Sequence, residues 1–166
     1  NNTPNVMVAT ITVTPKYTNN GITCTGTPQT FTITVNPIPT VNPVSSITRC
    51  HGTTVPAVNF QSSFGATNTI FEWNNSNVNI GSGLSATGIG NMSSFTANNT
   101  GTTPIVGTIS VTPKATNAQL TCIGTQITFP ITINPIPNVN AVGSQVVCNN
   151  TSTTAIDFTS LVPNTD

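Results

Sequence analysis

The sequence predicts an all-β protein made of β-sandwich domains in tandem, and three observations support this prediction. Phe, Ile and Val alternate with Thr or Pro in residues 30–35 and again in residues 128–133, which is the period of a half-buried strand. Both segments end in Asn-Pro-Ile-Pro, where proline removes a backbone donor and stiffens the exit from the strand. Both also belong to one long internal repeat, and we therefore interpret the chain as part of a tandem array.

The repeat has a constant offset. Lys16 corresponds to Lys114 (114 − 16 = 98), and the same ungapped offset relates Cys24 to Cys122 and Cys50 to Cys148. Roughly half of residues 8–62 are identical to the residues 98 positions later. We call two positions related by this offset counterparts. The repeat predicts three parts, namely the C-terminal part of one unit, a complete unit and the N-terminal part of a third, at residues 1–39, 40–137 and 138–166.

The composition excludes several classes of function. Only 4% of the residues are charged, against roughly 25% in ordinary domains, so the predicted solvent face consists of hydroxyl and amide groups. The formal net charge is zero, and the chain therefore offers no electrostatic attraction to nucleic acid or to an anionic membrane. No apolar run approaches the roughly 20 residues that span a bilayer. We expect neither nucleic-acid binding nor membrane insertion.

We interpret residues 1–39 as the closing hairpin of a unit, with one strand near residues 6–15 and a second strand that ends at Val35. Asn20-Gly21 between them suits a type I′ turn, in which both central residues have positive φ. The counterpart of this pair is Ala118-Gln119, so the sequence does not fix the turn type across units. Pro130 in the second hairpin predicts an edge strand, because a central strand would lose a ladder hydrogen bond there.

The complete unit contains signals for about seven short strands. Two are expected within residues 40–60, interrupted at Cys50-His51-Gly52, and a third at residues 70–75. Short strands follow near Leu84 and Phe95, and the closing hairpin occupies residues 104–133. About seven strands with intervening turns in about 98 residues are typical of an immunoglobulin-like sandwich.

Two groups of residues carry the architectural prediction. The expected core aromatics are Phe31, Phe71, Trp73 and Phe129. The expected seams between units are the two copies of Asn-Pro-Ile-Pro, which are Asn36, Pro37, Ile38, Pro39 and Asn134, Pro135, Ile136, Pro137.

The complete unit resembles the PKD-like repeats of Bacteroidota. The resemblance is carried by Phe71-Glu-Trp73, Phe95-Thr-Ala-Asn-Asn-Thr-Gly101, Cys122-x-Gly124 and Ile131-Thr-Ile-Asn-Pro135. Such repeats occur in very large surface adhesins exported by type IX secretion, including gliding adhesins. The chain departs from ordinary PKD domains, since Trp73 is followed by Asn-Asn-Ser instead of a Phe-Gly-Asp-Gly segment. The resemblance implies an extracellular β-sandwich on the cell surface and brings no catalytic residues with it.

The cysteines are the clearest chemical feature. Each unit has two, so the complete unit contains the pair Cys50 and Cys122. Paired cysteines in secreted modules usually form bridges, and we expect an intradomain disulfide between them. Reduced, buried thiols and a bridge across a seam (Cys24–Cys50 or Cys122–Cys148) remain alternatives. A simple sandwich would place Cys50 and Cys122 at opposite ends, which is an argument against the leading choice.

No other pattern indicates catalysis, a metal or a cofactor. His51 has Asn149 as its counterpart, so the repeat does not require an imidazole, and we expect an exposed turn residue. Glu72 and Asp157 belong to different units and cannot act as a carboxylate pair within one module. Gly81-x-Gly83 and Gly88-x-Gly90 lack the Lys-Ser/Thr of a phosphate loop, and a flexible loop is expected instead.

These observations predict a non-catalytic repeat of an extracellular filament, acting as a semi-rigid stalk in adhesion or gliding. Its expected partners are neighbouring repeats of the same chain, together with surface polysaccharide or the substratum. The alternative is a carbohydrate-binding or spacer module of a secreted polysaccharide-degrading enzyme, which would require an exposed Trp73.

Overall fold

The computed structural model describes residues 3–63 and 68–163. Residues 1–2 and 164–166, at the outer ends of the first and third predicted parts, lie outside the described residues, as do residues 64–67. The described residues form an all-β protein with several sheets, in which the single helical segment is the 3₁₀ turn η1 (Val78–Ile80). The predicted all-β class is confirmed.

The chain divides into two compact units, which we call unit 1 and unit 2 and which differ from the predicted repeat units. Each of them is assembled from separate stretches of sequence. Strands β7 (Thr69–Asn75), β11 (Ile105–Asn117) and β13 (Ile127–Asn134) contribute residues to both units. This division cuts through strands and does not test the predicted boundaries after residues 39 and 137, which stay a prediction. Unit 1 consists of Asn1–Asn42, Phe60–Glu72 and Val111–Ile127, and unit 2 of Pro43–Asn59, Trp73–Ser110 and Thr128–Asp166.

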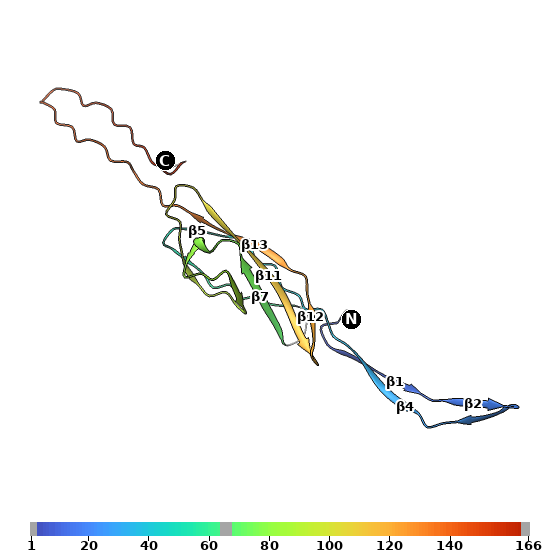
Figure 1. The fold of residues 1–166 in the computed structure, drawn as a ribbon. Coiled ribbons are helices and arrows are strands. Elements are labelled where there is room, and N and C mark those ends of the chain that lie inside the picture. Colours follow the sequence, from blue (N-terminus) through green and yellow to red (C-terminus); the bar gives the residue numbers. More distant parts are fainter. Residues whose placement is uncertain (1–2, 64–67, 164–166) are drawn as a thin grey trace. The chain divides into compact units, whose positions relative to one another are not determined.

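A long hairpin begins unit 1. Strand β1 (Met7–Val13) pairs antiparallel with β4 (Gln29–Val35), so that Ile11 lies opposite Phe31. The shorter strands β2 (Lys16–Asn19) and β3 (Ile22–Thr25) continue the hairpin to its tip, as Figure 1 shows for β1, β2 and β4. The strand-turn-strand organisation matches the prediction for this part of the sequence.

The two residues of the turn at the tip of this hairpin have positive φ, and so do their two counterparts. Asn20 and Gly21 have φ values of 47° and 81°, and Ala118 and Gln119 have values of 47° and 66°. The two hairpins therefore have turns with the same φ signs, although the sequence alone did not fix the turn type. A two-residue connection needs positive φ at both positions to match the strand twist, and Ala118 and Gln119 adopt it at a cost of about 1–2 kcal/mol each.

The largest sheet has the strand order β5-β13-β11-β7-β9, and β12 pairs with β11 outside this path. In β11 and β13, buried residues alternate with exposed or half-buried ones over most of each strand, so one face of each strand supplies core residues. Strand β5 pairs parallel with β13, and β12 pairs antiparallel with β11. The strands not yet delimited are β5 (Ile47–Cys50), β9 (Thr87–Ile89) and β12 (Leu120–Ile123).

The predicted edge position of Pro130 is wrong, because β13 has the neighbours β5 and β11 on its two sides. The physical reason that the proline is tolerated lies in the register. Strand β5 pairs with β13 from Ile131 to Asn134, so Pro130 lies just before the segment that β5 covers. A missing backbone donor at this position costs no ladder hydrogen bond to β5.

A second sheet in unit 2 has the order β6-β10-β8. Val58 and Met92 extend it by an isolated antiparallel bridge. Together with the larger sheet, this gives an all-β architecture compatible with a β-sandwich. The strands of this second sheet are β6 (Thr54–Val55), β8 (Gly81–Ser82) and β10 (Phe95–Ala97).

The buried side chains are mostly aliphatic and aromatic in both units. Three of the four aromatics predicted for the core are buried, namely Phe71, Trp73 and Phe129. Phe60 and Phe71 contact each other in unit 1, with ring centroids 5.9 Å apart. Apolar residues buried in unit 1 include Val41, Val111 and Ala115, and those in unit 2 include Val55, Ile80, Met92, Phe95, Ile109, Ile131 and Ile133.

The first seam packs against the end of the β11–β12 hairpin in unit 1. Pro37 and Pro39 are fully buried, and the backbone carbonyl of Pro39 lies so close to the Cα of Gly124 that a side chain there would overlap it. Asn117 Nδ2 also donates a hydrogen bond of 2.7 Å to Asn36 Oδ1. Gly124 is therefore required by the close approach of the seam, which explains the glycine of the Cys-x-Gly pattern.

This contact leads to a prediction for Gly124→Ala. The added methyl group would overlap the Pro39 carbonyl and lie 2.8 Å from Pro113 Cγ, and such overpacking typically costs about 1–3 kcal/mol. We expect the free energy of unfolding to fall by this amount, measured by urea titration with far-UV circular dichroism. Gly26→Ala is the matched control, because it meets only the equivalent proline contact, at 2.9 Å from Pro15 Cγ. Equal losses in the two variants would contradict the role assigned to the seam.

Candidate functional site

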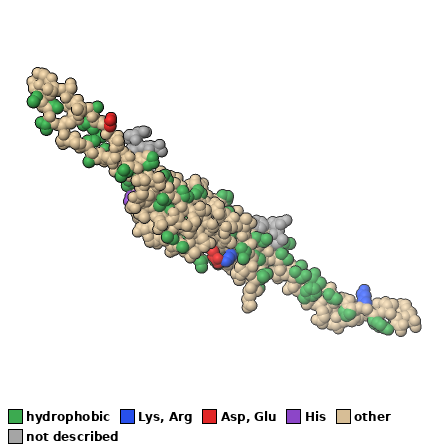
Figure 2. All heavy atoms as spheres, turned by 45° about the horizontal axis from the view of Figure 1, so that its top comes forward, with side chains coloured by type: hydrophobic (Ala, Val, Ile, Leu, Met, Phe, Trp, Pro, Cys, Tyr) green, Lys and Arg blue, Asp and Glu red, His purple; other side chains and the backbone are tan. Residues whose placement is uncertain are grey.

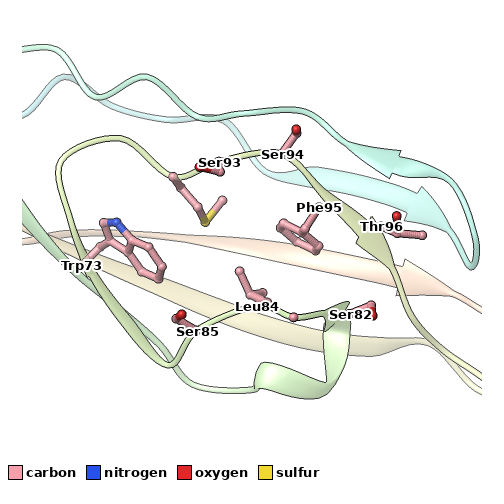
Figure 3. Close-up of a pocket in the computed structure, with 10 residues that line it drawn as sticks. Trp73, Ser82, Leu84, Ser85, Ser93, Ser94, Phe95 and Thr96 are labelled. Carbon is pink, nitrogen blue, oxygen red and sulfur yellow. The ribbon is translucent and has the colours of Figure 1, made fainter.

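An open pocket of about 450 Å³ lies in unit 2, between the loops that flank β8 and β10. Figure 3 shows Trp73, Leu84 and Phe95 directed toward the pocket, whereas the hydroxyl of Ser94 points away from it. The lining combines apolar side chains with hydroxyl groups and contains no charged group. The lining residues are Trp73, Ser82, Gly83, Leu84, Ser85, Met92, Ser93, Ser94, Phe95 and Thr96.

Trp73 forms a wall of this pocket but is itself only 7% exposed. A Cβ atom on Gly88 would overlap the indole ring, so the backbone at Gly88 covers part of the ring. The indole Nε1 is buried and has no hydrogen-bond partner. The indole therefore presents no free face on which a sugar ring could stack, and the burial matches the prediction that Trp73 belongs to the core. The glycines of the predicted flexible loop thus have a packing role.

The titratable groups do not gather into a reactive centre. Glu72 Oε2 accepts a hydrogen bond of 2.5 Å from Lys114 Nζ in unit 1, and both side chains are partly exposed. An exposed pair of this kind contributes about 0–1 kcal/mol to stability. Over residues 3–63 and 68–163, no group of three or more His, Cys, Asp or Glu side chains could hold a metal ion.

His51 has a structural contact that the sequence did not predict. Its side chain is half-buried, and Nδ1 accepts a hydrogen bond of 2.9 Å from the backbone N–H of Asn99. His51 does lie in a turn, but the expectation that it is exposed is wrong. The physical reason is that the turn at Gly52 is tied to β10, because the backbone N–H of Gly52 donates to the carbonyl of Ala97.

Asn99 is a polar centre that the sequence analysis missed. It is 4% exposed, and its Nδ2 donates hydrogen bonds of 2.8 Å to the carbonyl oxygens of Thr103 and Ile133. Its Oδ1 accepts from the backbone N–H of Gly101. The signal available in the sequence was Asn99-Thr-Gly101, since an asparagine two residues before a glycine is typical of an Asx-turn. All polar atoms of this amide are bonded, so its role is structural.

The expected disulfide between Cys50 and Cys122 is not present, and all four cysteines carry free thiols. The register gives the reason. Cys50 lies opposite Asn134, the last residue of β13, whereas Cys122 lies opposite Ala115 on β11 and precedes the start of β13. Eight strand residues cover roughly 26 Å, while a disulfide needs Cα atoms within about 7 Å. The seam-crossing bridges Cys24–Cys50 and Cys122–Cys148 are equally absent.

The hairpin of β1 and β4 exposes an apolar face. Phe31 is 52% exposed, although its counterpart Phe129 is 1% exposed, so the prediction that Phe31 belongs to the core is wrong. The sequence pattern is the same in both strands, but among the described residues β4 has β1 as its one sheet neighbour. Figure 2 shows hydrophobic side chains at the surface along this hairpin. We define the hairpin face as Ile11, Val13, Phe31, Ile33 and Val35.

Comparisons of the chain with protein-family models, with curated proteins and with solved structures gave no match. In the described part of the chain, no helix has the length and apolar character needed to traverse a lipid bilayer.

The cysteine assignment leads to a direct prediction. Alkylation of the unfolded protein without prior reduction should label four thiols, measured by intact mass. Because no bridge closes a loop, a thiol-free reductant should leave the thermal unfolding midpoint unchanged. In the chain-entropy treatment, reducing a bridge that closes about 72 residues would lower stability by about 4 kcal/mol. A mass showing two blocked thiols together with a drop in the midpoint on reduction would contradict the free-thiol state.

The buried amide of Asn99 leads to a second prediction. Asn99→Ala would leave the carbonyl of Ile133 without this donor in a buried position, and such a loss typically costs about 1–3 kcal/mol. We expect the free energy of unfolding to decrease by this amount. It is measured by urea titration, with Trp73 fluorescence as the signal. Asn98→Ala is the control, because its side chain makes a single exposed hydrogen bond, to the Asn79 carbonyl. The role of the buried network would be refuted by equal effects of the two substitutions.

Proposed function

We propose that this chain is a non-catalytic structural segment of a long extracellular filament, built from immunoglobulin-like, PKD-like repeats of about 98 residues. In this proposal the repeats form a semi-rigid stalk on the cell surface that serves adhesion or gliding motility. Export by type IX secretion and a Bacteroidota origin are carried by the sequence resemblance alone. The proposed partners are neighbouring repeats and, at the cell exterior, surface polysaccharide or the substratum.

The observation that carries the proposal is the recurrence of local structure at counterpart positions. Gly26 N donates to the carbonyl of Pro15 at 2.9 Å, and Gly124 N donates to the carbonyl of Pro113 at the same distance. Strands β1 and β2 together span residues 7–19, whose counterparts are the residues of β11.

The same recurrence relates the complete unit to the C-terminal part of the chain. Asn42 N donates to the carbonyl of Gln61 at 2.8 Å, and Asn140 N donates to the carbonyl of Thr159 at the same distance. Residues at counterpart positions thus form hydrogen bonds with partners that are also counterparts, although the parts of the chain differ greatly in burial. Local geometry that persists in this way supports a modular repeat.

The packing of the first seam supports a stiff connection between successive repeats. The Asn-Pro-Ile-Pro segment is short, and its prolines fix φ. The contact of Pro39 with Gly124 and the bond between Asn36 and Asn117 hold it against the next hairpin. A linker that is both restricted and packed transmits orientation along an array better than a flexible Gly/Ser linker does.

The nearly uncharged surface suits a protein that works outside the cell. Three basic and three acidic side chains are present in 166 residues, and Figure 2 shows few charged groups on the visible face. Screening by salt acts on exposed charges, so interactions between repeats with this composition should depend little on ionic strength.

The second candidate function is a carbohydrate-binding module. It is favoured by one observation, the uncharged pocket lined by serine and threonine hydroxyls beside Trp73. Burial of the indole argues against the stacking contact that most sugar sites use. Binding of the 166-residue chain on a glycan array, abolished by Leu84→Arg in the pocket, would support this candidate over the filament.

The filament proposal is tested by small-angle scattering on a protein that contains residues 40–137 three times in tandem. A strand of about ten residues spans roughly 33 Å, so we expect each unit to add about 35–45 Å to the maximum dimension. A matched protein with Gly-Ser in place of Pro-Ile-Pro at each seam should have a broader distance distribution. A compact particle, or identical flexible profiles for both proteins, would contradict the stalk model.

A further inference from the structure

The chain contains two kinds of cysteine, and each kind occurs at two counterpart positions. Cys24 and Cys122 lie in the short strands β3 and β12, next to the tip of a hairpin, and we call them hairpin cysteines. Cys50 is the last residue of β5, and Cys148 is its counterpart. We call these two the strand cysteines. Since both positions hold cysteine in each copy, the proposed array has one cysteine of each kind per repeat.

We propose that the strand cysteine of each repeat forms a disulfide with the hairpin cysteine of the following repeat, so that every seam carries one covalent bridge. This inference rests on the tandem array of the proposed function, but it does not require the array to be rigid. The two bridged positions are 170 residues apart (122 + 98 − 50 = 170). The largest separation between two cysteines of this chain is 124 residues (148 − 24 = 124), in agreement with its four free thiols.

The end of one repeat contacts the hairpin of the next repeat in unit 1. Asn36 directly follows β4, and its Oδ1 accepts the hydrogen bond of 2.7 Å from Asn117 Nδ2. Asn117 is the last residue of β11 and therefore lies at the tip of the hairpin that contains Cys122. The seam thus holds the last strand of one repeat against the hairpin that carries the hairpin cysteine of the next.

The strand cysteine lies beside the asparagine that makes this contact. In unit 2, Cys50 is directly opposite Asn134 in the parallel pair of β5 and β13. Asn134 is the counterpart of Asn36. Neighbouring strands of a sheet are about 4.8 Å apart, and residues directly opposite each other project from the same face. The strand cysteine of a repeat is therefore one strand away from the asparagine that reaches the next hairpin.

The hairpin cysteine lies on the same face of its hairpin as the second asparagine of the contact. Cys122 is opposite Ala115, and Asn117 is opposite Leu120. Residues two positions apart in a strand project from one face, so Ala115, Asn117 and Cys122 share a face. Cys122 is the diagonal neighbour of Asn117, a relation that corresponds to about 7–8 Å. The two cysteines of the proposed bridge thus flank the same hydrogen bond.

The bridge forms by thiol–disulfide exchange, with an external disulfide as the oxidant. The thiolate of one cysteine attacks a sulfur atom of the oxidant, breaks its S–S bond and releases one thiol. The thiolate of the second cysteine attacks the resulting mixed disulfide, forms the Sγ–Sγ bond and releases the second thiol. Two cysteine thiols are thereby oxidised, and one disulfide is reduced to two thiols. Disulfides form and persist outside the cytosol, where the filament is proposed to work.

A bridge at each seam would give the array a covalent connection beside the backbone. The bond between Asn36 and Asn117 and the contact of Pro39 with Gly124 are noncovalent. Both can open when the array is under tension. A disulfide next to them would keep successive repeats together and allow the contacts to form again.

The proposal is tested on a protein in which residues 69–137 are appended to the complete chain. Residues 138–166 are the counterparts of residues 40–68, so the appended stretch continues the repeat and supplies the next hairpin cysteine. Three versions retain two cysteines each and have serine in place of the others. The first keeps Cys50 and the appended Cys122, the second keeps Cys50 and the Cys122 of its own unit, and the third keeps Cys122 and Cys148.

Each version is equilibrated with reduced and oxidised glutathione, and the bridged fraction is measured by alkylation and intact mass. This fraction gives an effective thiol concentration. We expect the value for the first version to be at least about tenfold higher than for the other two, because a disulfide requires close Cα atoms.

The same measurement in concentrated urea separates folded structure from chain statistics. The loops closed in the second and third versions contain 72 and 26 residues (122 − 50 = 72 and 148 − 122 = 26). In an unfolded chain, short loops close more easily than a loop of 170 residues. The order of the three versions should therefore invert in urea, so that a high value for the first version in buffer is a property of the folded protein.

The seam hydrogen bond provides a matched pair of substitutions in the first version. Asn117→Ala in the appended stretch removes the expected bond to Asn134. It should lower the effective thiol concentration by about fivefold, which corresponds to the loss of one hydrogen bond. The same substitution in the original hairpin is the control and should leave the value unchanged, because that hairpin belongs to the other seam. Far-UV circular dichroism shows that both variants are folded.

Two results would overturn the proposal. One is an effective thiol concentration in the first version that is equal to or below that of the other versions in buffer. The other is an equal effect of Asn117→Ala in the two hairpins. The stalk model is judged separately, by the scattering of the tandem protein under reducing conditions. An extended scattering profile together with an unbridged first version would reject the bridge and retain the stalk.

Discussion

Burial in this structure depends on one constraint, which is whether another layer packs on the apolar face of a two-stranded hairpin. An isolated hairpin buries little surface, and a third strand or a second layer is needed for stability in water. On β11 and β13, another layer covers this face, and Ile109, Val111, Phe129, Ile131 and Ile133 are all buried. The counterpart positions in β1 and β4 have nearly the same sequence but remain largely exposed. The same local code thus gives the same hairpin in both places, while burial is decided by what lies against it.

This separation of local and non-local information explains what the sequence could predict. Strand periodicity and turn residues indicated the all-β class, the hairpins and the strand containing Phe71 and Trp73, because these signals are local. The burial of Phe31 was predicted wrongly because its sequence is that of a core position, and the pattern does not reveal whether a covering layer is present. The disulfide was predicted wrongly for a related reason. Cysteine number and spacing do not specify the parallel register that places Cys50 opposite Asn134.

The site was less predictable than the fold. The interaction of Asn99 with the carbonyl of Ile133 joins residues 34 positions apart, and no pattern in one sequence signals such a partner. His51 is a similar case, because its Nδ1 accepts a hydrogen bond from the backbone N–H of Asn99, which lies 48 positions later in the chain. The role of Gly124 also depends on a distant backbone group, the carbonyl of Pro39. Each of these residues looked unremarkable because its importance comes from contacts that the chain makes only after folding.

The two hairpins separate local sequence from burial at single positions, since Phe31 is 52% exposed and its counterpart Phe129 is 1% exposed. Apolar groups that are buried in one context retain the shape that fits the covering layer when they are exposed in another. The register of the exposed copy is nevertheless set by strand alternation and by the turn at Asn20-Gly21. Strand alternation and turn geometry therefore fix the hairpin itself, and the layer packed against it fixes which of its side chains are buried.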